Sequence, residues 1–149
     1  MKIKGDRLIV TFVAGENISE GDVVYISSAG TVKKAISSVA AKVVGVADES
    51  ASAGENIDVV IYGKKTVTAD GAISPGDRVV AASTAGRVAA GNTVTSSGHA
   101  HTENLDASYT QNATTASAAD TVEVGRVLGK ALGAASGAGD TLDILVCLA

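Results

Sequence analysis

The chain carries the same sequence pattern twice, and this repeat restricts the folds open to it more than any other feature. Residues 14–35 read AGENISEGDVVYISSAGTVKKA, and residues 69–90 read ADGAISPGDRVVAASTAGRVAA. A second pair of matches follows in the same order, residues 44–47 with 128–131 and residues 54–61 with 139–146. A module of about half the chain has therefore been duplicated. We expect an N-terminal arm and first strand over residues 1–13 and a single β domain over residues 14–149, with repeat halves 14–63 and 69–148.

Short apolar segments between turn residues indicate strands rather than helices. They predict strands at residues 3–13, 23–26, 31–35, 42–47, 57–62, 65–69, 78–82, 87–90, 122–132 and 141–148, with Gly63 dividing the fifth from the sixth. Two short helical turns are expected at most, at residues 35–42 and 48–53, because neither keeps a 3.6-residue apolar period. We predict an all-β fold: a small β-barrel built from an internal duplication, with little helix and one long loop insertion.

The two copies of one turn have a readable chemistry. The segment Ser74, Pro75, Gly76, Asp77 has proline at its second position and glycine at its third, the signature of a type II turn. The first copy, SEGD, keeps Gly21 and Asp22 but has glutamate in place of proline. We assign these residues a structural role in the turns. Beside them, four apolar residues are expected to face the core: Ile18, Val24, Ile73 and Val79.

The halves differ mainly by a polar insertion over residues 92–120, which contains both histidines. On a strand, His99, His101 and Glu103 would share one face, and Asp106 is a further candidate ligand, so a metal site is one interpretation. The flanking glycine, serine and threonine residues instead favour a polar loop with incidental imidazoles. We therefore expect no bound metal and no cofactor, and keep the histidines only as minor candidates.

Other chemical motifs are weak. Residues 125–130, GRVLGK, are one residue short of a phosphate-binding loop, and Ala131 stands where serine or threonine should follow. The recurring carboxylates Asp22 and Asp77 lie in equivalent turns, and Asp58 and Asp143 in equivalent strands, so their recurrence is explained without a catalytic pair. We expect no enzymatic activity.

Composition narrows the range of partners. The net charge is −4 and aromatic residues make up 3 % of the chain, which does not favour nucleic acid. No segment approaches the ~18 apolar residues of a membrane span. The single cysteine, Cys147, lies in the apolar run LVCL and is expected to be a buried small side chain. The early residues lack the apolar stretch of a signal peptide, because Asp6 and Arg7 interrupt it, so we expect the protein to be intracellular at synthesis.

Four segments resemble the small capsid cement, or head-decoration, proteins of tailed phages: GENISEGDVVYI (15–26), AKVVGVA (41–47), GAISPGDRVV (71–80) and GRVLGKAL (125–132). The resemblance covers roughly residues 14–91 and 121–146 and omits the insertion. It implies a barrel or β-tulip similar to the head-stabilising proteins of lambda-like phages. It also implies a homotrimer on the threefold and quasi-threefold axes of the shell, which clamps neighbouring major capsid proteins from outside.

The N-terminal arm is the candidate for capsid contact, because an extended segment can add a strand to a neighbour's sheet edge. Lys2, Lys4 and Arg7 would pair with acidic capsid residues, with Ile3 between them; alternatively, residues 8–13 are simply the first strand of the domain. We predict a virion decoration protein without nucleic-acid or membrane partners. The alternatives are another structural or adhesive β module of a tail or surface layer, and a metal-dependent binder that uses the His99/His101 loop.

Overall fold

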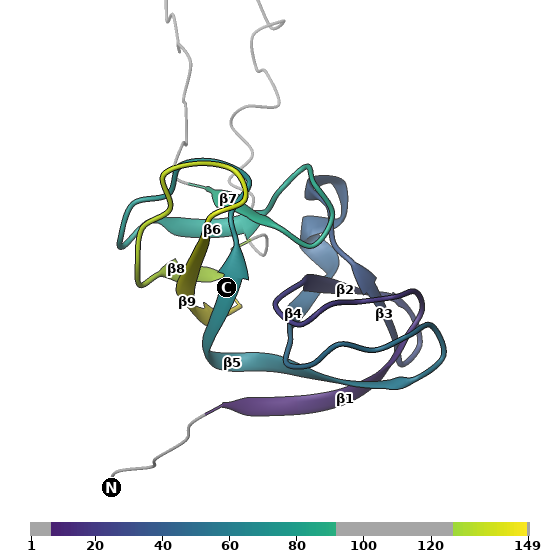
Figure 1. The fold of residues 1–149 in the computed structure, drawn as a ribbon. Helices are drawn as coiled ribbons and strands as arrows, with labels where there is room; N and C mark the ends of the chain where they lie inside the picture. The colour runs from purple at the N-terminus through teal and green to yellow at the C-terminus, as the bar shows by residue number, and fades with distance from the viewer. Residues whose placement is uncertain (1–6, 92–126, 149) are drawn as a thin grey trace, which may run out of the picture. The chain divides into compact units, whose positions relative to one another are not determined.

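The computed structural model describes residues 7–91 and 127–148 (Figure 1). The elements are β1 (Leu8–Ala14), β2 (Val23–Ser28), β3 (Thr31–Lys34), the 3-10 helix η1 (Ser37–Lys42), β4 (Val43–Ala47), β5 (Asn56–Thr68), β6 (Arg78–Ala81), β7 (Val88–Ala90), β8 (Gly129–Ala131) and β9 (Thr141–Cys147). The predicted all-β fold is confirmed. Within the described ranges, no helix is long and apolar enough to span a membrane.

The first half forms a closed five-stranded barrel. Its strands follow the order β1-β3-β2-β4-β5, and β5 closes the ring by pairing with β1. The β1–β3 contact is parallel and short, joining Val13 and Ala14 to Thr31 and Val32. Small and β-branched side chains fill the interior, as expected for a chain with so few aromatic residues: Ala14, Ile18, Val24, Val32, Ala47, Ala51, Ile57 and Val59.

The second half repeats this arrangement around the far part of β5. Its strands follow the order β5-β9-β8-β6-β7, and a parallel bridge between Ala69 and Val88 brings β7 back to the end of β5. β5 thus belongs to both halves, and Figure 1 shows it turning a corner between β1 and β9. The prediction of two strands divided by Gly63 was wrong. Gly63 takes a φ of 123° inside one continuous strand, a conformation open to glycine.

The predicted turns have matching geometry in the two halves. The amide of Asp22 donates to the Ser19 carbonyl at 3.1 Å, and the amide of Asp77 donates to the Ser74 carbonyl at 3.1 Å. Gly21 and Gly76 have φ of 88° and 86°, as the third position of a type II turn requires. Each aspartate also accepts a bond from the amide of the serine that opens its turn, at 2.9 Å.

The hydrogen-bonding pattern extends the repeat beyond the residues that match in sequence. Ile9 lies opposite Val60 and Val13 opposite Asn56; at the same offsets, Lys64 lies opposite Leu145 and Thr68 opposite Thr141. The Thr11 hydroxyl donates to Asp58 at 2.7 Å, and the Thr66 hydroxyl donates to Asp143 at 2.6 Å. β1 is therefore the counterpart of the second part of β5.

Three smaller expectations meet different outcomes. The four predicted core residues, Ile18, Val24, Ile73 and Val79, are all buried. η1 occupies the first candidate helical segment, but residues 48–53 form turns and a bridge between Ile18 and Ala51. The prediction that Cys147 is buried was wrong: it is partly exposed, because it ends β9 at the margin of the sheet.

Candidate functional site: the uncovered first strand

β1 is an apolar strand that the described part of the chain leaves largely uncovered. Leu8 is 58 % exposed, Ile9 39 %, and Val10 and Val13 38 % each. Neighbouring residues of a strand point to opposite faces, so this strand offers apolar side chains on both faces. Such a pattern is typical of a strand covered on both sides, and here the cover is missing from the described residues.

Among residues 7–91 and 127–148, no strand covers the outer edge of β1 before Val13. β1 pairs with β5 from Leu8 to Val13, but with β3 only at Val13 and Ala14. The Ala14 amide donates toward β5, to Glu55, while the Val13 amide donates the other way, to Gly30. By the alternation of an antiparallel ladder, the main-chain groups of Ile9 and Thr11 point away from β5, toward that open edge. Such an edge accepts an added strand.

The equivalent strand in the second half is built differently. Where β1 has Ile9 and Val10, the second part of β5 has Lys64 and Lys65. Lys64 is exposed and opposes pairing with another chain, because pairing would desolvate its charge, whereas Lys65 is largely buried. One fold therefore carries a charged strand and an apolar one at corresponding positions.

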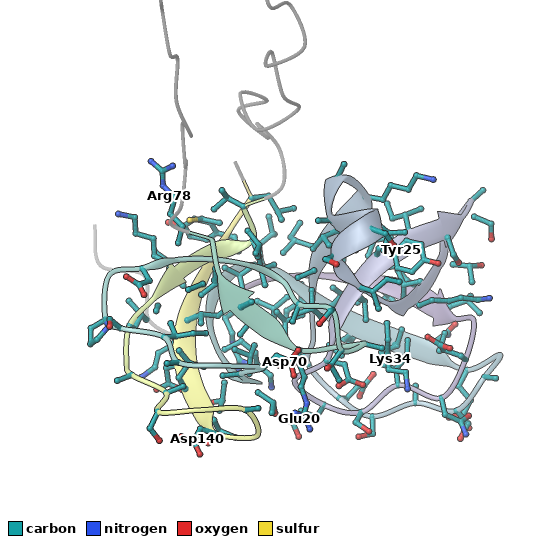
Figure 2. The ribbon with its side chains drawn as sticks, turned by 90° about the horizontal axis from the view of Figure 1, so that it is seen from above. Glu20, Tyr25, Lys34, Asp70, Arg78 and Asp140 are labelled. Atoms are coloured by element: carbon teal, nitrogen blue, oxygen red, sulfur yellow. The ribbon has the colours of Figure 1, made fainter. Side chains whose placement is uncertain are left out.

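A polar groove of about 790 Å³ lies beside the start of β1, where the two halves meet. Asp48 accepts bonds from Arg7 at 2.7 Å and from Lys65 at 3.2 Å, and Lys65 also donates to Glu20 at 2.7 Å. The Lys65 side chain is only 9 % exposed, so this ion pair is largely desolvated on one side. In Figure 2, Glu20 lies near the seam between the two halves. The groove is lined by three cations and two carboxylates, and each of these cations is paired with a carboxylate.

The carboxylates with shifted pKa values are bonded to turns and neighbouring strands. Burial raises the pKa of Asp22, opposed by the Ser19 amide and by the charge of Lys34. Hydrogen bonds lower the pKa of three others, mainly from Thr84 to Asp70, from Ser136 to Asp140 and from Thr66 to Asp143. Among the described residues, no cluster of histidine, cysteine and acidic side chains has the arrangement of a metal site.

The residues predicted for capsid contact and for metal binding are only partly visible. Lys2, Ile3 and Lys4 lie outside the described residues, as do His99, His101, Glu103 and Asp106. Arg7 is described, and its guanidinium is engaged by Asp48 within the same chain. What sequence reasoning missed is the exposure of β1. The available signal was the run LIVTFV, which is apolar without alternation.

Comparison with solved structures shows a likeness of fold. No family model matches the chain, and no curated protein matches it. Among solved structures, the chain is similar to the head fiber gp8.5 N base of bacteriophage phi29, with a TM-score of 0.55 and 12 % sequence identity over 95 % of each chain. At that identity, the likeness establishes that this chain and the phi29 fiber base share a fold.

Proposed function

We propose that this chain is a structural protein of a tailed-phage head, bound to the outer surface of the shell. The observation that carries the proposal is the fold shared with a phage head fiber base along nearly the whole of both chains. The sequence resemblance to head-decoration proteins lies in four short segments and points to the same part of the virion. The proposal assigns no catalytic role.

More specifically, we propose that the chain is a capsid cement protein. The chain would bind as a homotrimer at threefold and quasi-threefold axes and hold neighbouring major capsid proteins together. Each contact between the cement and one capsid subunit can be weak, because a trimer binds several subunits at once and multivalency raises the overall affinity. The uncovered β1 supports this role, since it offers an apolar strand and an open edge to a partner.

The test adds the purified protein to expanded, undecorated shells of its phage. Binding should saturate, and the shells should resist heat and osmotic shock better, because a ligand that binds only the assembled lattice stabilises that lattice. Reconstruction of the decorated shells should place the density on the threefold and quasi-threefold axes. Failure to bind shells at micromolar concentration would contradict the whole proposal.

A truncation separates the arm from the rest of the domain. Removing residues 1–7 should weaken shell binding far more than it lowers the melting temperature of the free protein. The truncation also removes the Arg7–Asp48 ion pair, so Asp48→Asn is the control that keeps the arm; because it breaks the Lys65–Asp48 pair as well, it sets an upper limit on the stability lost with the Arg7 pair. If the truncated protein saturates shells at the wild-type concentration, the arm is not the contact.

The likeness to a fiber base favours a second candidate, an anchor that mounts an external structure without cementing the shell. Both candidates predict saturable binding on the outer surface. Only the cement predicts a gain in shell stability, so binding with unchanged resistance to heat and osmotic shock favours the anchor.

A further inference from the structure

The chain makes a contact between its two halves at the seam where they meet. The turn of the first half lies over the second part of β5, so that a Cβ on Gly21 would lie 3.0 Å from the Thr66 carbonyl oxygen. Beside that turn, Lys65 of the second half pairs with Glu20 and Asp48 of the first and is only 9 % exposed. We call the surface around Glu20, Gly21 and Asp48 the receiving side and residues 64–68 the docking strand.

β1 is the counterpart of the docking strand in the first half. Thr11 corresponds to Thr66 and Val10 to Lys65, since the two strands pair at the same offsets. Val10 is 38 % exposed, against 9 % for Lys65. The main-chain groups of Thr11 point to the outer edge of β1, as the Thr66 carbonyl points toward Gly21. β1 is therefore a docking strand that no receiving side covers among the described residues.

The second half carries the counterpart of the receiving side. Pro75 and Leu132 stand at the positions of Glu20 and Asp48. Leu132 is 51 % exposed, and Pro75 is exposed as well. A Cβ on Gly76, in the same turn as Pro75, would meet no atom of the described residues within 4 Å. This second receiving side is thus as uncovered as β1.

The residues of the two uncovered sides are complementary to each other. Within the chain, the contact joins a lysine to two carboxylates; at the equivalent positions stand a valine, a proline and a leucine. Val10 lies on one uncovered side, and Pro75 and Leu132 lie on the other. A charge on one side alone would be buried without a partner when the sides meet. Because both sides lack charge together, they fit each other, and this selects a second copy of the chain over an unrelated apolar partner.

We propose that copies of this chain associate head to tail: the receiving side of one copy's second half covers β1 of the next copy. The contact repeats between copies what the first half does to the docking strand within each copy. It joins two different surfaces, so it forms a closed ring when the rotation between copies allows closure, and not a twofold pair. A ring of three is the homotrimer of the proposed function, and the inference rests on that function only for the number of subunits.

The experiment measures the mass of the full-length protein without capsids, by sedimentation equilibrium over a range of concentrations. The wild type should reach three times the 14.7 kDa chain mass at micromolar concentration. Val10→Lys and Leu132→Asp each place an unpaired charge in the contact, and each should raise the concentration needed for association by about tenfold or more.

The double variant Val10→Lys/Leu132→Asp re-creates between copies the Lys65–Asp48 pair of the internal contact. Val10 lies opposite Val59 on β5, whereas the Leu132 amide donates to Asp143 on β9, so the new pair forms between copies. The double variant should recover the wild-type mass at low salt and lose it at high salt, because ions screen the new pair.

Ile9→Lys is the matched control, because it adds the same charge at the neighbouring position of β1. Its counterpart, Lys64, is 66 % exposed beside the internal contact and pairs with Asp143, so a lysine at position 9 should leave the association unchanged. All three substituted side chains are exposed in the single chain, so circular dichroism and melting temperature should show intact folds.

A wild type that stays monomeric over the whole concentration range overturns the inference, and so does an oligomer that neither single variant weakens. Loss of association in both single variants without recovery in the double variant also overturns the head-to-tail contact. Shell binding is measured separately. A monomer that saturates shells would sink this inference alone, whereas an oligomer rescued by the double variant that ignores shells would sink the proposed function.

Discussion

The two halves of this molecule share a backbone pattern but differ in the side chains at corresponding strands. β1 and the second part of β5 pair with their neighbours at the same offsets, and Thr11 and Thr66 make the same bond to Asp58 and Asp143. Yet β1 presents Ile9 and Val10, while β5 presents Lys64 and Lys65. Main-chain hydrogen bonds and turns maintain the fold in both halves, so the exposed side chains of corresponding strands can differ without changing the fold.

The first turn has Glu20 where the second has Pro75, and this difference also concerns side chains and not the backbone fold. In the first half, the Glu20 amide donates to the Ser50 hydroxyl at 3.0 Å, and its carboxylate accepts from Lys65. Proline has no amide hydrogen and could not replace it there. The equivalents of Asp48 and Lys65 in the second and first halves, Leu132 and Val10, are both apolar. The network therefore joins Glu20 and Asp48 of the first half to Lys65 of the second, and the equivalent positions Pro75, Leu132 and Val10 carry no charge.

The strongest test of the shared backbone concerns Gly45 and Gly129. A Cβ on either would collide with a main-chain carbonyl oxygen, that of Val60 for Gly45 and that of Leu145 for Gly129. We expect Gly45→Ala and Gly129→Ala each to lower the free energy of unfolding by about 3–5 kcal/mol. Chemical denaturation measures this, with Gly137→Ala as the control in open space. A loss confined to one glycine would break the equivalence of the halves.

The ion-pair network should contribute a smaller, one-sided effect. Lys65→Met leaves Glu20 without its cation, although Asp48 keeps Arg7, so we expect a loss of about 1–2 kcal/mol. Lys64→Met, at the exposed neighbouring position, should cost under about 0.5 kcal/mol. Urea melts at low and high salt would check both. Equal costs for the two lysines would mean that burial of Lys65 adds nothing.

Substitution of the two turn glycines should lower stability by different amounts, because their surroundings differ. Gly21→Val and Gly76→Val both force a branched residue into positive φ, at a cost of at least ~1 kcal/mol. Gly21 should be the more sensitive, because its added Cβ would lie 3.0 Å from the Thr66 carbonyl, whereas Gly76 has open space. Thermal melts of both, with Gly71→Val as control, decide the order. No loss in either would refute the type II assignment.

The pH dependence of the free energy of unfolding should distinguish Asp22 from the other aspartates with shifted pKa values. Because burial raises its pKa above the ordinary value of 3.8, the folded state holds the proton more tightly than the unfolded state. That contribution to stability is fully present below about pH 3.8 and is lost as the pH rises through the folded pKa. The wild type should therefore gain stability relative to Asp22→Asn on acidification. Asp70, Asp140 and Asp143 have lowered pKa values and act oppositely, but they are common to both proteins. A constant difference between pH 7 and pH 3.5 would contradict this assignment.

A small effect is expected from shortening the insertion, where the two halves differ most in length. The Gly91 amide donates to Arg78, and the Leu128 amide donates to Val79, so the insertion leaves and re-enters on either side of β6. Two strand spacings, about 10 Å, separate such positions. Replacing residues 92–120 with a short Gly-Ser linker should change the free energy of unfolding by under about 1 kcal/mol, since loop closure depends weakly on length. Loss of cooperative unfolding would show that the insertion belongs to the core.

The sequence by itself determined the duplication, the strand content and the turns. These features are local, because a glycine at positive φ and a short apolar run act through neighbouring residues. The tertiary structure decided which strands close the barrel, that β5 crosses Gly63 without a break, and that the described residues leave β1 exposed. The sequences LIVTFVA and GKKTVTA share only a threonine and an alanine, so the equivalence of these strands appears only in their pairing partners. The run LIVTFV indicates apolar side chains on both faces of β1, but whether other segments cover them depends on distant parts of the chain. The approach of Lys65 to Asp48 likewise joins distant segments, and no local pattern encodes it.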